Sequence, residues 1–450
     1  MPQPAAAREH WSSGVGFVLA SAGCAIGLGN LWGFVYRASQ GGGAVFVVLY
    51  LLVVVLILTP VLVAEFVIGR STGQTPIDAL RTVGGSRWGL VGWLFVVAST
   101  LVLSYYTVLM GWTGLTLCNA LLNGLPATPQ LSSQVFASMA SGSKAVWGHV
   151  TSLLLTGLVV AAGVRRGLER LSLWFMPLLF VLLIGLVVWA SGLDGAAQGY
   201  RTFLLHWDGS RLLDPTTIRN AFSQAFFSIG AGLGALMTYA SYLDRRSRLP
   251  SEAVAVVSLD TAVALLAGLV VFPIVSSFGL TDQVSASAVG SGTLFIALPT
   301  GLASLGTTGT VAAVVFFSLA YVAAITSAVS MLEVAVASLI DRLGWSRPRA
   351  VWSAVAVVAL LGLPSALDSD ILTAMDKVFG GVALMLGGLL IALLLGWLQP
   401  DRYLGDLDQT PPLLKRMLLL GLRWTSPLAI GAGLLLSLVD LLPSWLPNAT

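Results

Sequence analysis

The chain has 450 residues, of which 56% are hydrophobic and only 10% are charged, and its mean hydropathy is +0.90. These values exclude a soluble domain, because so few charged residues cannot cover so much apolar surface in water. The net charge of +3 does not indicate a nucleic-acid partner, since the Lys and Arg residues cluster in alternate loops between apolar segments.

Enzymatic motifs are absent from the sequence, which has no zinc-type cysteine spacing, no phosphate-binding glycine loop and no nucleophile elbow. Only three histidines are present, and none belongs to a nucleophile–base pair or a metal cluster. We therefore expect neither an enzyme nor an organic cofactor. Cys24 and Cys118 fall in apolar segments, so we expect free thiols rather than a disulfide.

Apolar segments long enough to cross a bilayer recur along the whole chain. A transmembrane helix needs about 20 predominantly apolar residues, and the sequence predicts about eleven such helices. Their expected bounds are 14–36, 42–69, 88–122, 146–163, 168–191, 219–243, 254–278, 306–341, 347–364, 372–398 and 415–441. We therefore expect an all-α integral membrane protein in the lipid bilayer, with a single domain over residues 1–450.

The distribution of basic residues predicts the orientation in the membrane. They gather in every second loop, as Arg70, Arg81 and Arg87; Arg165, Arg166 and Arg170; Arg245, Arg246 and Arg248; Arg342, Arg347 and Arg349; and Arg402, Lys415 and Arg416. The positive-inside rule assigns these loops, with Arg8, to the cytoplasm. No cleavable signal precedes the first span, so an odd number of spans places the C-terminus outside a multi-pass protein of the cell (inner) membrane.

The first predicted span, 14–36, carries helix-weakening residues in its middle. Its stretch SAGCAIGLGNLWGFVY contains Gly23, Gly27 and Gly29 together with the amide side chain of Asn30. Glycine destabilises a helix, and an amide inside a membrane needs hydrogen-bonding or ionic partners. The sequence therefore indicates a break in this helix.

The sixth predicted span, 219–243, is interrupted in the same way by Gly230, Gly232 and Gly234. The two spans hold corresponding places in two halves of five helices, at about 12–191 and 219–398, which precede an extra helix at about 415–441. Paired interrupted helices indicate a secondary transporter of two inverted repeats, with its site at the breaks. Small residues that merely allow close helix packing are the alternative explanation.

A break in a membrane helix is tolerated only around a polar cavity or inside protein. Its free carbonyl oxygens suit Na⁺, and the amides at the start of a half-helix suit a carboxylate. One break can therefore bind a cation and an anionic group together.

Eight motifs resemble, in their order along the chain, the neurotransmitter:sodium symporter family. They are REHW, AGCAIGLGNLW, GGGAVFVVLY, AEFVIGR, SYYTV, QAFFSIGAGLG, TYASY and AAITSAVSMLE. The resemblance runs from Arg8 to about Trp397 and implies a bacterial amino-acid transporter with the fold of the leucine transporter. It implies Na⁺-coupled symport by alternating access, in a monomer or weak dimer.

The resemblance implies two sodium sites. One site uses the carbonyls of Gly23, Ile26 and Ala323 with the hydroxyls of Thr326 and Ser327. The other uses the Ala25 carbonyl, Asn30, Ser228 and Asp260, and the substrate carboxylate completes it. For the two hydroxyls of the first site, hydrogen bonding back to their own helix is the structural alternative.

The resemblance also implies a substrate site. The amides near Leu28 and Gly29 with the Tyr106 hydroxyl would bind the carboxylate, and the carbonyls of Ala25, Phe227 and Ser228 would accept from the amine. Gly27 stands where monoamine carriers of the family have Asp, which favours an α-amino acid. The side-chain pocket would be lined by Val102, Tyr106, Phe227, Gly230, Leu233, Ser327 and Met331, which favours a neutral, hydrophobic or aromatic L-amino acid. Plain core packing is the alternative for the two aromatic residues.

Asp260 departs from the family, which usually has Asn there. Chloride-independent bacterial relatives commonly have Glu one turn further on, where this chain has Ala264. We expect Asp260 to supply that missing charge beside Tyr50, Gln224 and Ser228, so that transport needs no chloride. If neutral at some stage it would carry a proton, and an Asp paired with a basic group is the structural alternative.

Gly33 is the second departure, because the family has a gating Arg there, opposite an acid that is present as Asp376. Arg37 lies one turn further on roughly the same face. It is expected either to reach Asp376 or to leave a looser gate in which Asp376 pairs with Lys377.

Arg8 and Asp341 match the ion pair of the family's inner gate. Two further functions stay open from the sequence: an amino-acid sensor that does not transport, and a symporter of another small zwitterion that uses Asp260 for protons.

Overall fold

The computed structural model describes residues 10–244, 247–280 and 293–445. Helices form almost all of this part of the chain, and the β-pairing in it is an isolated bridge between Gly43 and Trp207. The all-α membrane fold expected from the sequence is confirmed, whereas the division into two inverted repeats stays a prediction.

Nine helical segments of the described chain are long and apolar enough to cross a bilayer. They are Ala44–Thr72, Ser86–Leu122, Gly142–Ala161, Val164–Ala190, Leu249–Ser277, Gly306–Leu343, Arg347–Leu367, Ser369–Leu398 and Pro412–Leu441. Each lies within about five residues of a predicted span. Two of the starts differ from expectation because proline is accommodated in a first helical turn, as at Pro250 and Pro412.

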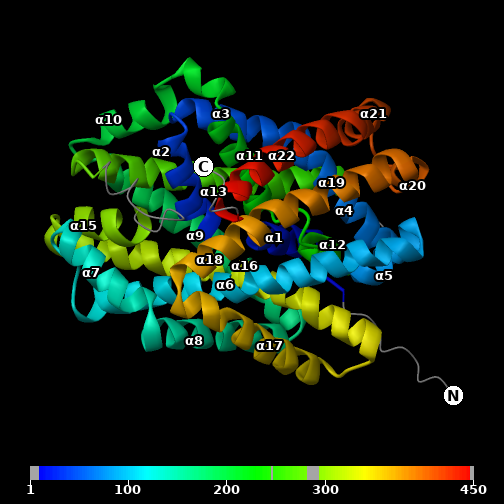
Figure 1. Ribbon diagram of the computed structural model, residues 1–450, viewed down its shortest axis with the longest axis horizontal. Coiled ribbons are helices and arrows are strands. Elements are labelled where there is room, and N and C mark those ends of the chain that lie inside the picture. The colour runs from blue at the N-terminus through cyan, green and yellow to red at the C-terminus, as the bar shows by residue number, and fades with distance from the viewer. Residues whose placement is uncertain (1–9, 245–246, 281–292, 446–450) are drawn as a thin grey trace.

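The helices follow one another along the chain in the order shown in Figure 1. They are α1 (Gly14–Ala25), α2 (Phe34–Gln40), α3 (Ala44–Leu52), α4 (Thr59–Thr72), α5 (Pro76–Gly84), α6 (Gly89–Leu122), α7 (Pro129–Ala140), α8 (Gly142–Ala161), α9 (Arg170–Ala190), α10 (Ala196–Tyr200), α11 (Pro215–Ile229), α12 (Ala235–Ala240), α13 (Leu249–Ser277), α15 (Leu298–Ala303), α16 (Gly306–Leu343), α17 (Arg347–Leu367), α18 (Ser369–Met375), α19 (Leu384–Leu393), α20 (Pro400–Gly405), α21 (Pro412–Leu420) and α22 (Ser426–Trp445). Short π-helical stretches join several of them, including η1 (Gly29–Gly33) before α2 and η9 (Asp376–Ala383) before α19.

The first span is broken, as expected. The segments Gly14–Ala25 and Gly29–Gln40 are bent by 53° at the break between them. Ser13 caps α1 by accepting from the Gly16 amide, and the helix ends where Ile26 becomes extended, at φ −71° and ψ 111°. The chain then re-enters a helical conformation at η1 and continues into α2.

The segment expected as the sixth span forms two separate helices, α11 and α12, with a break between them, and it is not among the nine long apolar segments of the described chain. Asp214 caps α11 by accepting from the Thr217 amide at 3.1 Å, and Gly230 ends it in the left-handed conformation. Figure 1 shows α1 and α12 near the centre of the bundle, with α8 and α17 along one edge of this view. The helix α1 packs against α9, α12, α13 and α16, so both breaks lie inside the protein.

Residues 280–304 connect α13 to α16. Residues 281–292 lie outside the described chain, and the rest forms η8 (Thr293–Ala297) and α15, which pack against α7, α13 and α16. Leu294 and Phe295 are buried there. The described part of the connection is therefore an ordered cover at this end of the bundle.

Candidate functional site

The glycines of the first break are required for space. A Cβ atom at Gly27 would lie 2.5 Å from Tyr106 Oη and 2.7 Å from Ser327 Oγ, and one at Gly29 would lie 2.8 Å from the Phe227 ring. Such distances are too short for any side chain, so α6, α11 and α16 approach the bare backbone here. The break is thus a place where three other helices meet the chain directly.

The glycines of the second break are required for conformation. Gly230, Gly232 and Gly234 have φ values of +70°, +87° and +76°, which residues with a side chain rarely adopt. The Glu65 carboxylate on α4, fully buried, accepts from the Gly232 amide at 2.7 Å. This bond satisfies one of the backbone donors that the break exposes.

Five oxygen atoms converge between the first break and α16. Ser327 Oγ lies 3.0 Å from the Ile26 carbonyl oxygen and 3.4 Å from those of Gly23 and Ala323. Thr326 Oγ1 lies 2.9 Å from the Ala323 carbonyl oxygen. All residues of the first expected sodium site therefore lie together, and neutral oxygen atoms are the ligands that a hard cation prefers.

A second polar cluster lies on the other side of the first break, around the fully buried Asp260 on α13. Asn30 Nδ2 donates to Asp260 Oδ1 at 2.7 Å and to Ser228 Oγ at 2.9 Å. The Ser228 hydroxyl also lies 2.8 Å from Asp260 Oδ2, and the Tyr50 hydroxyl donates to the same oxygen at 3.3 Å. The partners of Asp260 in the described part of the chain are thus uncharged, which disfavours a structural ion pair.

Two expected members of this cluster differ from the rest. Ala25 is buried and lines the cavity described next, but it does not take part in the hydrogen bonds of the cluster described above. Gln224 has its hydrogen bonds elsewhere: its Nε2 donates to the Gly29 carbonyl at 3.0 Å, and its Oε1 accepts from Arg37.

A cavity of about 30 Å³ lies between the two breaks. Its lining includes the expected substrate residues Ala25, Gly29, Val102, Tyr106, Phe227, Ser228, Gly230, Leu233, Ser327 and Met331. The Leu28 amide donates to Tyr106 Oη at 3.1 Å, at the start of the half-helix η1, while Leu28 itself faces a second cavity. Backbone donors at such a helix end favour an anionic group.

Three residues that line this cavity were not predicted as part of the substrate site, namely Cys24, Ser330 and Ala235. Ser330 follows Ser327 by three positions on α16, a spacing that places both side chains on one helix face. Ala235 begins α12 directly after the second break. Helix periodicity could have identified Ser330 from the sequence, and nearness to the second break could have identified Ala235.

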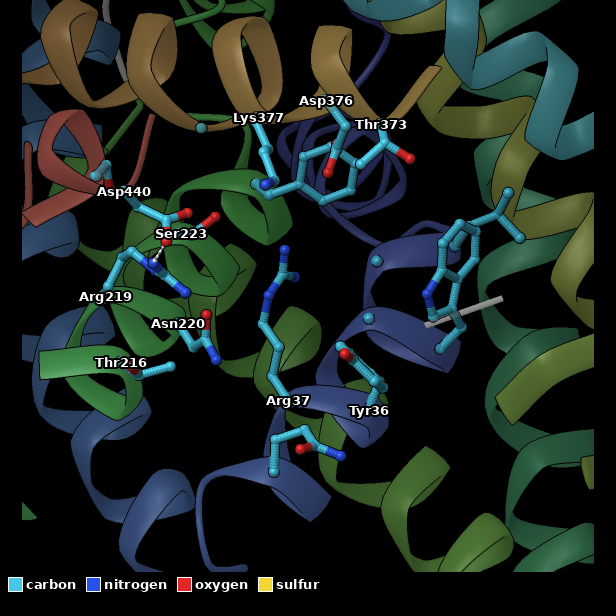
Figure 2. A pocket seen from close by; sticks show the side chains of 18 of the residues that line it. Tyr36, Arg37, Thr216, Arg219, Asn220, Ser223, Thr373, Asp376, Lys377 and Asp440 are labelled. Carbon is cyan, nitrogen blue, oxygen red and sulfur yellow. Dashed lines mark ion pairs between the residues drawn. The ribbon is translucent and has the colours of Figure 1, made fainter. Parts of the chain in front are cut away.

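A second, larger cavity of about 320 Å³ lies above the first, and we call it the vestibule. Gly29, Tyr106 and Phe227 line both cavities and so form the boundary between them. Figure 2 shows its charged side chains: Arg37 rises into the middle, Arg219 pairs with Asp440 of α22, and Asp376 and Lys377 lie across from the Arg37 guanidinium.

The two residues of the expected outer gate line this vestibule together. Asp376 Oδ1 accepts from the Tyr105 hydroxyl at 3.0 Å, while Arg37 donates to Gln224. The structure thus places both residues in one cavity, each with a different hydrogen-bonding partner.

The opposite end of the site is closed by the segment before α1. Trp11 Nε1 donates to the Tyr239 carbonyl at 2.8 Å, and its ring packs edge-on against those of Phe17, Tyr239 and Tyr242. Of the expected inner gate, Asp341 accepts from the Thr75 amide at 3.4 Å, and Arg8 lies outside the described residues. The path from the small cavity toward this end is filled by aromatic side chains.

A family model, related sequences and a solved structure all relate this chain to the same group of transporters. The model of the sodium:neurotransmitter symporter family matches residues 8–136 and 130–444. A sodium-dependent transporter of Bacillus subtilis, YhdH, is 36% identical over 367 residues, which cover 81% of this chain and 80% of the relative. A sodium- and chloride-dependent GABA transporter of Drosophila melanogaster is 28% identical over 376 residues, covering 74% of this chain and 39% of that protein. The crystal structure of MhsT in complex with L-phenylalanine superposes with a TM-score of 0.88 at 36% identity, covering 96% of this chain and 100% of that one.

Proposed function

The chain belongs to the sodium:neurotransmitter symporter family, a family of sodium-coupled transporters and not of enzymes, and on this basis we propose that it carries a neutral, hydrophobic or aromatic L-amino acid across the cell membrane together with two sodium ions and without chloride. One observation carries the proposal. Two separate groups of oxygen atoms and the free amide end of a half-helix meet at the break of the first span, around a single cavity.

The first sodium ion binds among the carbonyls of Gly23, Ile26 and Ala323 and the hydroxyls of Thr326 and Ser327. The hydroxyls now donate to these carbonyls. A bound cation would turn each hydroxyl so that its oxygen lone pairs face the ion. The ion would thereby hold α16 and the first break together.

The second sodium ion binds among Asn30, Ser228, Asp260 and the Ala25 carbonyl, and the substrate carboxylate completes this site. Asn30 Oδ1 accepts from the Gly27 amide at 3.0 Å, so its NH₂ group faces Asp260. Binding of a cation there requires the amide to turn and present Oδ1. The substrate carboxylate would sit beside the Leu28 amide and the Tyr106 hydroxyl, which lie 3.1 Å apart.

The side chain of the substrate enters the apolar part of the small cavity, between Val102, Phe227, Leu233 and Met331. The absence of a charged side chain in this lining favours a neutral substrate. The complex of the structurally similar MhsT with L-phenylalanine supports an aromatic or large aliphatic amino acid. The amine would be bound by the carbonyls of Ala25, Phe227 and Ser228.

Asp260 replaces chloride as the negative charge beside the second sodium ion. It is fully buried among uncharged partners, so its charge is available to a cation. If it binds a proton at one stage of the cycle, the same residue would return a proton across the membrane. This alternative predicts that uptake changes with the pH gradient at constant sodium gradient.

Alternating access moves the site between the vestibule, which we place outside, and the Trp11 end, which we place in the cytoplasm. Arg37 and Asp376 form the outer gate, and Arg8 and Asp341 form the inner gate. The N-terminus then lies in the cytoplasm and the C-terminus outside.

Purified protein in proteoliposomes tests the proposal. An imposed inward sodium gradient should drive accumulation of a radiolabelled neutral amino acid, in chloride and in gluconate alike, and a sodium ionophore should abolish it. If two sodium ions accompany each neutral substrate molecule and no chloride or proton moves, every transport event moves two positive charges across the membrane. The ratio of the transport current to the substrate uptake measures this number. Sodium-dependent binding without accumulation would favour the amino-acid sensor instead.

A further inference from the structure

Gly33 leaves a space in the first broken helix that another side chain of the same helix fills. A Cβ atom at Gly33 would lie 3.1 Å from Gln224 Oε1 and 3.2 Å from Arg37 Nη1. Both distances are shorter than ordinary van der Waals contact, so these two groups occupy the volume of a side chain at position 33. Side chains on a helix lean toward its N-terminus, and Arg37 follows this direction back by one turn.

From this position Arg37 reaches the first break through one residue. Its Nη1 donates to Gln224 Oε1, and Gln224 Nε2 donates to the Gly29 carbonyl at 3.0 Å. Gln224 is fully buried, whereas Arg37 enters from the vestibule. The Arg37 guanidinium at one end of this chain polarises the Gln224 amide, which lies between it and the Gly29 carbonyl. In a low-dielectric interior, each hydrogen bond of the chain then strengthens the next.

Gly29 is the point at which this chain of contacts meets the substrate site. It lines both cavities and follows Leu28, whose amide faces the Tyr106 hydroxyl. The Gly29 carbonyl belongs to the peptide group between Gly29 and Asn30. A hydrogen bond that holds this carbonyl fixes the orientation of that peptide group, and thereby the direction in which η1 begins. The amides that would meet a carboxylate are therefore oriented in part from the vestibule.

The neighbouring acids make their hydrogen bonds and ion pairs with other residues. In the described part of the chain, Asp376 accepts from Tyr105 and Asp440 pairs with Arg219. The hydrogen bond of Arg37 that the structure shows is to Gln224.

We propose that Arg37 is a positioning residue for substrate recognition: through Gln224 it holds the Gly29 carbonyl and orients the amides that bind the substrate carboxylate. This inference rests on the proposed amino-acid site and adds to it a determinant of affinity outside the cavity. It also follows that positions 33 and 37 share one volume, which accommodates one arginine and not two.

Sodium-driven uptake and equilibrium binding test this role. The variant Arg37→Ala should raise the KM and the substrate Kd about tenfold, the effect of losing a hydrogen bond to a charged group, with kcat changed by less than about twofold. Arg37→Lys should recover part of the affinity, and Gln224→Met should match Arg37→Ala. Arg211→Ala, which removes an exposed arginine that pairs with Asp208 and Asp214, is the matched control.

An exchange of positions makes the test sharper. Gly33→Arg alone should weaken binding, because two guanidinium groups compete for one space, while Gly33→Arg combined with Arg37→Ala should bind better than either single variant. The proposal is overturned if Arg37→Ala lowers only kcat, or if the double variant is no better than the weaker single one.

Stability measurements separate this proposal from the proposed function. Gly33→Ala should lower the melting temperature in the wild-type background and raise it in the Arg37→Ala background, where the guanidinium is gone, Gln224 is no longer held by it, and alanine favours the helix. If the wild-type protein neither binds nor transports any amino acid, the proposed function fails. The melting temperatures of Gly33→Ala in the two backgrounds would still show whether positions 33 and 37 share one volume. Equal effects of Gly33→Ala in both backgrounds would refute it.

Discussion

Replacing Asp260 by Asn tests the proposed source of the negative charge beside the second sodium ion. The carboxylate is fully buried, accepts from Asn30 Nδ2 at 2.7 Å, and lies beside the hydroxyls of Ser228 and Tyr50. Asparagine has nearly the same shape, so the substitution removes the charge and one acceptor while the packing of α13 is kept. The effect on sodium binding then reports the charge itself.

The expected size follows from these contacts. A hydrogen bond to a charged group contributes about 1.5–3 kcal/mol, and the variant loses about one such bond to the cation site. About 2 kcal/mol corresponds to roughly a thirtyfold change in an equilibrium constant. We therefore expect the sodium concentration for half-maximal uptake to rise by about tenfold to thirtyfold.

Uptake in proteoliposomes, measured in sodium chloride and in sodium gluconate, is the assay. Wild-type protein should transport equally in both salts, whereas Asp260→Asn should transport better in chloride, because its new amide donor joins the two hydroxyls in a pocket that now lacks a negative charge. Asp370→Asn, the same change at an exposed acid of α18, is the control. Loss of wild-type uptake in gluconate, or an unchanged sodium requirement in the variant, would refute this reasoning.

Three further predictions concern the two breaks. Thr326→Ala removes one proposed oxygen ligand and should raise the half-saturating sodium concentration about tenfold, whereas Thr310→Ala, at a partly exposed threonine near the start of the same helix, should leave it unchanged in the same uptake assay. Gly27→Ala places a methyl group 2.5 Å from the tyrosine hydroxyl of the substrate site and should abolish amino-acid binding measured at equilibrium; Gly185→Ala, where the added Cβ meets no atom within 4 Å, should bind normally and melt at the same or a higher temperature. Glu65→Gln exchanges the carboxyl acceptor of the second break for an amide and should lower the thermal stability by about 1 kcal/mol in a reversible denaturation experiment; an unchanged melting curve would show that the bond to the break contributes little.

The membrane fold and both breaks could be predicted from the sequence, because their signals are local. The length of an apolar segment determines whether it spans a bilayer, and glycine in mid-helix weakens it wherever the helix lies. The three left-handed glycines from Gly230 to Gly234 belong to this local class. The limits of the helices were predicted less well, by up to about five residues at their starts.

The reasons for the first break could not be read from its own residues. Gly27 and Gly29 have no need of a left-handed backbone, and their requirement comes from Tyr106, Ser327 and Phe227 on three other helices. Contacts between residues so far apart in the chain depend on how the helices pack. The resemblance to a family supplied the identity of these partners, and packing supplied the reason that a side chain is excluded.

Gln224 shows how one substitution redirects a neighbour. From the sequence it was assigned to the anion pocket beside Asp260, yet its two hydrogen bonds join Arg37 to the Gly29 carbonyl. A Cβ atom at position 33 would lie 3.1 Å from Gln224 Oε1 and 3.2 Å from Arg37 Nη1, so the contact between these two groups depends on the glycine there. The spacing of Gly33 and Arg37 was visible in the sequence, but the partner that receives the guanidinium was not.

Asn30 suggests how sodium and substrate depend on each other. Its Oδ1 accepts from the Gly27 amide and its NH₂ group faces the carboxylate of Asp260, at 3.0 Å and 2.7 Å. A cation between Asn30 and Asp260 can be met only by the oxygen, because an NH₂ group has no lone pair to offer. The turn that presents Oδ1 to the cation releases the Gly27 amide, one residue before the Leu28 amide at the expected place of the substrate carboxylate. At the proposed sites, binding of sodium at one end of this side chain would therefore free a donor for the substrate at the other and couple the two ligands through a single rotation.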